Sequence, residues 1–368
     1  MEELIQAQAV LIPHFEEVGG LANSSVWIKY YINMGFNMNL KNCRENYFDN
    51  LKLLLITLVV IGHTIEPLIN SHPNIKLLYV VIYSFHMPLF VFISGYFSKD
   101  INNEEKLFSK ITNIFVPYVI FQLLYSLFNI YVLKAENFKI TLVYPYWITW
   151  YLLSLFIWNL ILPYFCKVKY SIIISLLISI LCGYDTNIGY YLSLSRTITF
   201  FPYFLMGYFT EKHHITIIRQ YIAKKYAVLT LLAIFPLLYL INNKINYKWF
   251  YGSLSYSQLN SSVYPNYIID ITLYILAIII SICILTLVPN KKFFFTHLGS
   301  RSMTVYVFHG FIIKLLLKYN FFDYIESFRT EIFIIILSFL IVIILSSKYI
   351  NKIAKVIIYP KILKQATR

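Results

Sequence analysis

Two histidines lie in the middle of long apolar segments of this 368-residue chain: His63 in the sequence VIGHT and His86 in SFHMP. A neutral imidazole accepts a proton near neutral pH, so histidine is suited to remove the proton of a reacting hydroxyl. If the two segments are neighbouring antiparallel helices, the imidazoles lie at a similar depth. A buried histidine is more often structural, and that alternative stays open for both residues.

Lys52 lies eleven residues before His63. On an α-helix this spacing places both residues on one face, about 16 Å apart. A lysine at that position can hold an anionic group, or it can be an ordinary interfacial anchor. Asp49 and Asn50 stand close before Lys52, and they also fit a helix N-cap.

Further polar candidates stand in or beside other apolar segments. Glu66, three residues after the first histidine, either orients an imidazole or faces water. Arg196 opens an apolar segment, where arginine is poorly tolerated unless it is paired or holds an anion, and it could steady an oxyanion or an acceptor. Trp147, Trp150 and Tyr151 open another segment, as aromatic residues of a membrane interface often do. His309 is a weaker candidate, expected nearer the cytoplasmic end.

The segments that position these residues are predicted to be membrane spans. Of the 368 residues, 59% are hydrophobic and 13% are charged, whereas soluble proteins carry about 25% charged residues. A soluble fold could not cover so much apolar surface, and the same figures exclude disordered, collagen-like, coiled-coil and disulfide-rich chains. We predict an all-α polytopic membrane protein with about ten transmembrane helices. The expected spans are 51–70, 77–97, 111–133, 146–165, 169–184, 192–210, 226–242, 267–288, 303–318 and 331–350, of which the fifth and ninth are short.

The basic residues indicate the orientation of these spans. A net charge of +14 would suggest nucleic acid in a soluble protein, but here the basic residues lie in short loops between apolar segments, so we expect no nucleic-acid partner. With the N-terminus in the cytoplasm, 22 of the 31 Lys and Arg residues fall inside and 8 fall outside. The positive-inside rule therefore predicts that both termini are cytoplasmic.

We expect one membrane domain, over residues 46–352, between a cytoplasmic segment (1–45) and a basic cytoplasmic tail (353–368). Residues 1–37 differ in composition from the rest, which favours a vector-derived or mis-started leader over the alternative, an interfacial helix. The sequence contains no metal-ligand spacing, P-loop or dinucleotide motif, so no metal is predicted.

An ordered set of short motifs resembles the acyltransferase family 3 membrane O-acyltransferases, in the branch similar to fucose 4-O-acetylase. The resemblance runs from about Met38 to the tenth span. Family members carry a basic residue, ten intervening residues and a histidine in the first span; Lys52 and His63 match this pattern, with Lys where relatives often have Arg. The other matching motifs are, in chain order, YFDNLK, GH, FHMPLF, ISGY, the stretch from Lys110 to Tyr118, WYL, SR, FPYF, GY, GSRS and HG.

The resemblance implies transfer of an acyl group, usually acetyl, from cytoplasmic acetyl-CoA to a hydroxyl of a glycan or another envelope molecule. We therefore expect an O-acetyltransferase of the bacterial cytoplasmic membrane that acts on a cell-envelope or capsular polysaccharide or on a lipid-linked saccharide. The matching positions imply catalysis by His63, His86 and Arg196, acetyl-CoA binding by Lys52, Lys110 and Ser94, and acceptor binding by Glu66, Trp150 and Tyr151.

Two other functions remain as alternatives. A transporter or flippase of an envelope polysaccharide precursor would explain ten helices and buried polar groups. It explains the paired histidines less well, and carboxylates for proton coupling are almost absent from the spans. The second alternative is a structural membrane subunit of an envelope complex.

Overall fold

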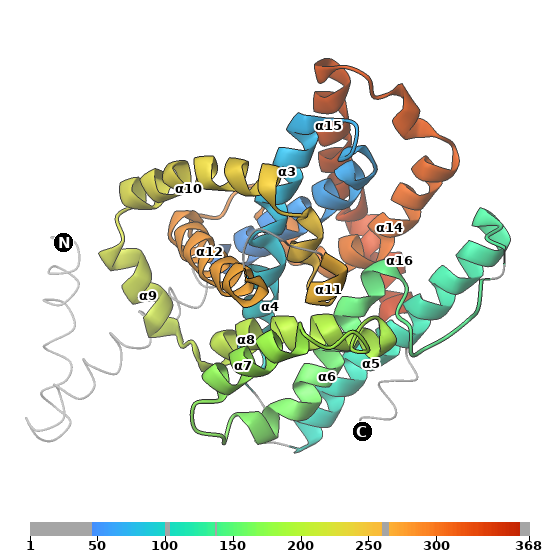
Figure 1. Ribbon diagram of the computed structural model, residues 1–368. Helices are drawn as coiled ribbons and strands as arrows, with labels where there is room; N and C mark the ends of the chain where they lie inside the picture. The colour runs from blue at the N-terminus through green and yellow to red at the C-terminus, as the bar shows by residue number, and fades with distance from the viewer. Residues whose placement is uncertain (1–45, 100–103, 137, 260–264, 361–368) are drawn as a thin grey trace, which may run out of the picture.

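The computed structural model describes residues 46–99, 104–136, 138–259 and 265–360 (Figure 1). These residues form helices joined by turns and loops, and this part of the chain contains no β-strand. Apolar helices long enough to cross a bilayer recur along it. The protein is therefore an all-α, multi-pass membrane protein, which confirms the prediction from composition.

Residues 46–65 form the first helix, which continues into the short η2 (Glu66–Leu68). Short 3-10 and π segments, labelled η, lie between the α-helices. The elements that follow are α3 (Pro73–Tyr83), α4 (His86–Tyr96), α5 (Glu104–Leu127), η3 (Phe128–Leu133), η4 (Trp147–Thr149), α6 (Trp150–Phe165), α7 (Ser171–Cys182), η5 (Tyr191–Ser193), α8 (Leu194–Phe209), α9 (Lys212–Tyr221), α10 (Lys224–Lys244), η6 (Tyr247–Tyr251), α11 (Tyr256–Leu259), α12 (Asn266–Leu287), α13 (Thr296–Gly299), α14 (Ser302–Lys318), η7 (Phe321–Tyr324), α15 (Phe328–Leu345) and α16 (Lys348–Ile358).

Seven helical segments of the described chain are long and apolar enough to cross a membrane. They are Asn46–Leu68, Pro73–Tyr96, Leu107–Leu133, Trp147–Phe165, Lys224–Asn242, Asn266–Leu287 and Phe328–Leu345. The other three expected spans correspond to α7, α8 and α14, which have 12, 16 and 17 residues. At about 1.5 Å per residue α7 is about 18 Å long, shorter than a hydrocarbon core of ~30 Å. The fifth and ninth runs were predicted to be short, and the lengths of α7 and α14 confirm this. α8 is a third short helix, which was not predicted.

The second span is interrupted in its middle, directly before His86. Pro88 has no backbone N–H and its ring crowds the carbonyl four residues earlier, so a regular helix is broken here. α3 ends and α4 begins on either side of residues 84–85. The His86 Nδ1–H donates to the carbonyl of Ile82 at 2.8 Å, which supplies that carbonyl with a side-chain donor at the break. The proline thus determines the local geometry of this histidine.

α4 and α8 cross at a point where only glycine fits. A Cβ on Gly95 would lie 1.9 Å from the carbonyl oxygen of Phe204, and one on Gly207 would lie 1.8 Å from that of Phe92. The two backbones therefore touch, as small residues allow in membrane bundles. This contact fixes α8, which carries Arg196, against α4.

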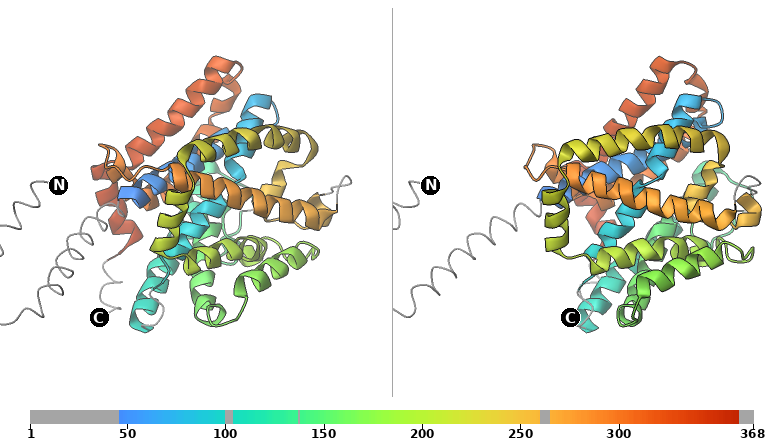
Figure 2. Two further views of the ribbon diagram at one scale, coloured as in Figure 1. Left: turned by 90° about the vertical axis from the view of Figure 1, so that its left-hand side faces the viewer. Right: turned by 60° about the vertical axis from the view of Figure 1, so that its left-hand side comes forward.

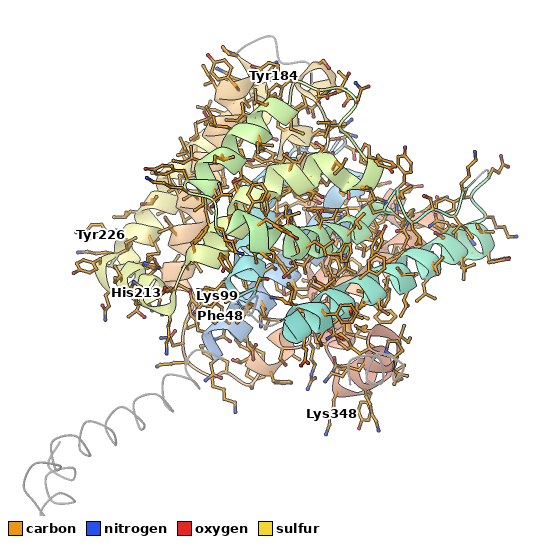
Figure 3. The ribbon with its side chains drawn as sticks, turned by 90° about the horizontal axis from the view of Figure 1, so that it is seen from below. Phe48, Lys99, Tyr184, His213, Tyr226 and Lys348 are labelled. Carbon is orange, nitrogen blue, oxygen red and sulfur yellow. The ribbon has the colours of Figure 1, made fainter. Side chains whose placement is uncertain are left out.

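The helices pack side by side between two ends of the molecule. In both views of Figure 2, α10 runs beside α12 and α7 beside α8. Figure 3 places Phe48, Lys99, His213 and Lys348 in the lower half of the bundle and Tyr184 at its top. The charge count assigns the lower end to the cytoplasm; we call it the inner end and the opposite one the outer end. This assignment stays a prediction.

The membrane domain was expected to end at residue 352. This position lies inside the last described helix, α16. α16 packs against α5 and α14, and its Ala354 and Ile358 are buried. The helix therefore belongs to the packed bundle. Residues 1–45 and 361–368 lie outside the described residues, so the expectations for the leader and for the end of the tail stay predictions.

Candidate active site

His63 stands at the centre of a polar cluster inside the bundle. Its Nδ1 lies 3.3 Å from Glu66 Oε2 and 3.5 Å from the Tyr83 hydroxyl. The Trp147 ring packs edge-on against the imidazole, with ring centroids 4.7 Å apart. Because a carboxylate only accepts hydrogen bonds, the neutral imidazole carries its proton on Nδ1 and presents Nε2 as its basic nitrogen.

A second imidazole, that of His309 on α14, stacks on His63 with ring centroids 5.5 Å apart. His309 is fully buried, and its Nδ1–H donates to the carbonyl of Val305 at 3.0 Å. Its Nε2 is buried without a hydrogen-bond partner in the described part of the chain. We expected His309 nearer the cytoplasmic end, and this was wrong: the helices pack so that α14 presents it at the depth of His63.

Glu66 is the carboxylate of this cluster, and it interacts with three basic groups. Besides the imidazole of His63, the side chains of Lys314 and Arg196 interact with it electrostatically. Lys314 lies on α14, five residues after His309, with its Nζ 4.4 Å from the centre of the Trp147 ring. Of the two alternatives for Glu66, the geometry favours the one in which it orients an imidazole.

His86 is joined to His63 through a tyrosine. The Tyr83 ring centroid lies 6.4 Å from that of His63 and 4.6 Å from that of His86. His86 is buried, and its Nδ1–H is taken by the Ile82 carbonyl. The two histidines of the first two expected spans are thus neighbours with Tyr83 between them.

Trp147 adopts a backbone conformation that bulky residues rarely take. Its φ of 38° lies in the left-handed region, which costs about 1–3 kcal/mol for such a residue. The Gln122 side chain fixes the adjoining chain by accepting hydrogen bonds from the Tyr146 N–H (2.8 Å) and the Thr149 hydroxyl (2.7 Å). The indole contacts both imidazoles. The strained turn therefore holds the Trp147 indole against the imidazoles of His63 and His309.

Arg196 lies in the first turn of α8 among aromatic rings. Its Cζ is 5.1 Å from the ring centre of Trp150 and 5.6 Å from that of Tyr190. Its Nε–H donates to the carbonyl of Tyr251 at 3.3 Å. Residues 192 and 193 have φ values of 48° and 52°, so the chain turns sharply before the helix begins. Trp150, expected to bind the acceptor, is thus a direct partner of Arg196.

Lys52 and Lys110 meet at the inner end of the bundle, around Phe97. The Lys52 Nζ lies 4.6 Å from the ring centre of Phe97 and 3.9 Å from the Asp49 carboxylate. Lys110 donates to the Phe97 carbonyl at 3.1 Å. The structure therefore brings together two of the three residues that we expected to bind the donor.

Asn50 is not a helix N-cap, because residues 46–65 are helical and it lies within them. Its amide donates to the carbonyls of Pro289 and Lys291, both at 2.9 Å, and its Oδ1 accepts from the Thr296 hydroxyl at 2.7 Å. The N-cap interpretation was therefore wrong. Asn50 fastens a loop at the inner end of the bundle.

Ser94 and Tyr151, which we expected on opposite sides of the reaction, bond to each other. Their hydroxyl oxygens are 2.5 Å apart, and the Ser94 hydroxyl also lies 2.9 Å from the carbonyl of Phe90, to which it donates. Tyr151 is therefore the donor to Ser94. This half-buried pair joins α4 to α6.

Four residues of the site were missed as candidates from sequence: Tyr83, Trp147, Tyr251 and Lys314. Lys314 carried a signal, since a lysine within an apolar run requires a reason. Trp147 was counted among residues of a membrane interface. The two tyrosines carried no signal of their own in a chain with 33 tyrosines.

The site of this multi-pass membrane protein is thus a histidine beside a carboxylate inside the bundle, with cationic side chains toward both ends. A family model described as an acyltransferase domain matches residues 45–348. The chain belongs to acyltransferase family 3. Among curated proteins, it is similar to the nodulation protein NolL of Mesorhizobium japonicum, with 48% identity over 60 residues, which are 16% of this chain and 16% of that protein. No solved structure matches the chain.

Proposed function

We propose that this membrane acyltransferase moves an acetyl group from cytoplasmic acetyl-CoA to a hydroxyl of a cell-envelope or capsular polysaccharide, or of its lipid-linked precursor. The observation that carries the proposal is the pair formed by His63 and Glu66, 3.3 Å apart within the bundle. A base of this kind is what an alcohol needs in order to attack a thioester. The expected location is the bacterial cytoplasmic membrane.

In this reaction His63 Nε2 removes the proton of the acceptor hydroxyl, and the hydroxyl oxygen attacks the carbonyl carbon of the thioester. The new C–O bond forms, the C–S bond breaks, and the leaving thiolate receives the proton from the imidazolium. His63 is then neutral again and no oxidant or reductant is needed. Glu66, which accepts the Nδ1–H, stabilises the imidazolium between the two proton transfers.

The donor is proposed to enter from the inner end. Lys52 and Lys110, which meet at Phe97, would hold the phosphates of coenzyme A there. The pantetheine arm would then follow the helix face shared by Lys52 and His63, about 16 Å long. Ser94 would line this path, with its hydroxyl held by Tyr151.

The acceptor is proposed to enter from the outer end, beside Glu66, Trp150 and Tyr151. Arg196 stands there with Trp150, where its guanidinium could stabilise the oxyanion of the tetrahedral intermediate or hold the acceptor. His86 acts as a positioning residue in this scheme. Its ring packs against Tyr83, whose hydroxyl lies 3.5 Å from His63 Nδ1.

The test is acetyl transfer by purified protein from radiolabelled acetyl-CoA to envelope polysaccharide, with His63→Ala beside the wild type. Loss of a general base costs about 10²–10⁴-fold in rate. A structural histidine would instead lower stability and activity together, so membrane abundance and detergent melting are measured on the same samples. His213→Ala is the matched control, because His213 is exposed on α9 and pairs with Glu211 at 3.2 Å, outside the site.

Well-folded His63→Ala protein that transfers acetyl at the wild-type rate would contradict the mechanism. Transport of a saccharide precursor without any acetylation would favour the flippase alternative.

A further inference from the structure

Arg196 has hydrogen-bond donors that no described residue accepts. Of its five N–H groups, only Nε–H has a hydrogen-bond partner among the described residues, the Tyr251 carbonyl at 3.3 Å. The rings of Trp150 and Tyr190 attract the positive charge but leave the remaining four N–H groups without an acceptor. Those donors are available to a ligand.

Lys314 is the second cation that interacts electrostatically with Glu66. Its Nζ lies 4.4 Å from the ring centre of Trp147 and 5.9 Å from that of Tyr146. Within the described parts of the chain, neither Lys314 nor Arg196 has a carboxylate within 4.0 Å. Lys314 also makes no hydrogen bond there. Two half-buried cations thus lack a direct protein counter-ion.

The charges of this cluster do not balance. Glu66 is the carboxylate with which both cations interact electrostatically, and its Oε2 already accepts the proton of His63 Nδ1. With His63 neutral, two positive charges face one negative charge. Withdrawing an unbalanced cation from water is costly, so such residues within a membrane protein most often serve a ligand.

We propose that Arg196 and Lys314 bind an anionic group of the acceptor, either the carboxylate of an acidic sugar or a phosphate attached to the saccharide. This inference rests on the proposed function and narrows its acceptor class. An arginine fork binds a carboxylate or phosphate through two parallel hydrogen bonds, and a lysine adds a point charge beside it. A neutral sugar would leave the excess positive charge uncompensated.

The phosphates of coenzyme A are the other anions in the reaction, and they belong to the opposite end. Lys52 and Lys110 lie at the inner end around Phe97. Arg196 and Lys314 instead interact electrostatically with Glu66, which follows the far end of the same first helix. The thioester must lie at His63, between these two pairs of cations. The acceptor is therefore the substrate whose charge reaches the outer pair.

The test measures binding directly, with protein in phosphatidylcholine nanodiscs and paired saccharide probes. One pair is a glucuronate-containing trisaccharide and its methyl ester; the other is a glycosyl phosphate and the corresponding methyl glycoside. We expect the wild type to bind each anionic probe about tenfold or more tightly than its neutral partner. Lys314→Gln and Arg196→Gln should each weaken only the anionic probe by about tenfold, and Lys314→Arg should retain most of its affinity.

Lys318→Gln is the matched control. Lys318 lies one turn further along α14, is exposed, and donates to the carbonyl of Val132 at 2.5 Å. This variant should bind all four probes as the wild type does. Equal affinity for charged and neutral probes, or equal weakening of both in Lys314→Gln, would overturn the inference. A third outcome would also overturn the inference. If Lys314→Gln weakens the binding of phosphatidylglycerol added to the nanodiscs but not that of the anionic saccharides, the anion at this site is a lipid headgroup.

Failure of this inference is distinguishable from failure of the proposed function. Acetyl transfer that depends on His63 but shows no preference for anionic acceptors leaves the function standing and removes the inference. Selective binding of anionic saccharides without any acetyl transfer supports the anion site and removes the proposed function.

Discussion

The imidazole of His309 lies stacked on that of His63, 5.5 Å from centroid to centroid, although the two residues come from the first and the ninth expected spans. Its Nδ1–H is held by the Val305 carbonyl, so Nε2 carries the free lone pair. That nitrogen is buried with no partner in the described part of the chain. The second imidazole is therefore packed against the proposed base, and we expect the two histidines to act together in the reaction.

His309→Phe tests this relationship, because phenylalanine keeps the stacked ring and removes the lone pair. We expect the kcat for acetyl transfer to fall about tenfold or more, while the melting temperature in detergent stays near that of the wild type. His309→Ala should lower both, since it also leaves a cavity. A kcat near that of the wild type in His309→Phe would show that the second histidine serves packing alone.

Lys52 is expected to act on the donor rather than on the chemical step. Lys52→Arg should retain much of the activity, while Lys52→Ala and Lys52→Glu should raise the KM for acetyl-CoA by about tenfold or more with a smaller effect on kcat. Steady-state kinetics with varied donor concentration measures this. Lys292→Glu, in an exposed loop at the inner end, is the control. An unchanged donor KM in Lys52→Glu would return Lys52 to the role of an interfacial anchor.

The crossing of α4 and α8 should be intolerant of any side chain. Gly95→Ala places a methyl group where the Phe204 carbonyl oxygen would be 1.9 Å away, so we expect a loss of about 1–3 kcal/mol or more of unfolding free energy and a lower melting temperature in detergent. Gly189→Ala is the matched control, because its added Cβ meets nothing within 4 Å. Equal melting of the two variants would mean that the backbones do not touch at this crossing.

The orientation of the bundle can be checked by labelling single cysteines in intact cells, on a background without native cysteines. With both termini in the cytoplasm, a membrane-impermeant maleimide should reach cysteines at Lys139 and Lys248 but not at His213 and Lys292. All four positions are exposed, so accessibility depends on the side of the membrane alone. External labelling at His213 would reverse the orientation predicted from the basic residues.

Much of the protein could be predicted from local sequence. Long apolar runs must be helices in a bilayer, because each backbone polar group needs a partner within its own segment. The same periodicity placed Lys52 and His63 on one helix face. Glu66 lies three positions after His63, and the structure shows these two side chains in contact. These relations lie within one segment, where spacing along the chain determines spacing in space.

The lengths of the helices were less predictable. α7 has 12 residues, as the short fifth run predicted, but α8 has only 16, although its run was expected to be of full length. Left-handed residues at 170 and at 192–193 begin these two helices abruptly, and nothing in the hydrophobic pattern marks such turns. Hydropathy records which residues avoid water but not where the backbone bends.

The sequence by itself determined the class of protein, the apolar segments and the face of the first helix that carries its base. Only the tertiary structure decided which residues contact that base: His309 from α14, Tyr83 from α3 and Trp147 from η4. The rotation of each helix about its axis, and the neighbour it faces, depend on side-chain and backbone packing between segments. Contacts such as that of Gly95 with Phe204 join residues far apart in the chain, and spacing within a single helix carries no information about them.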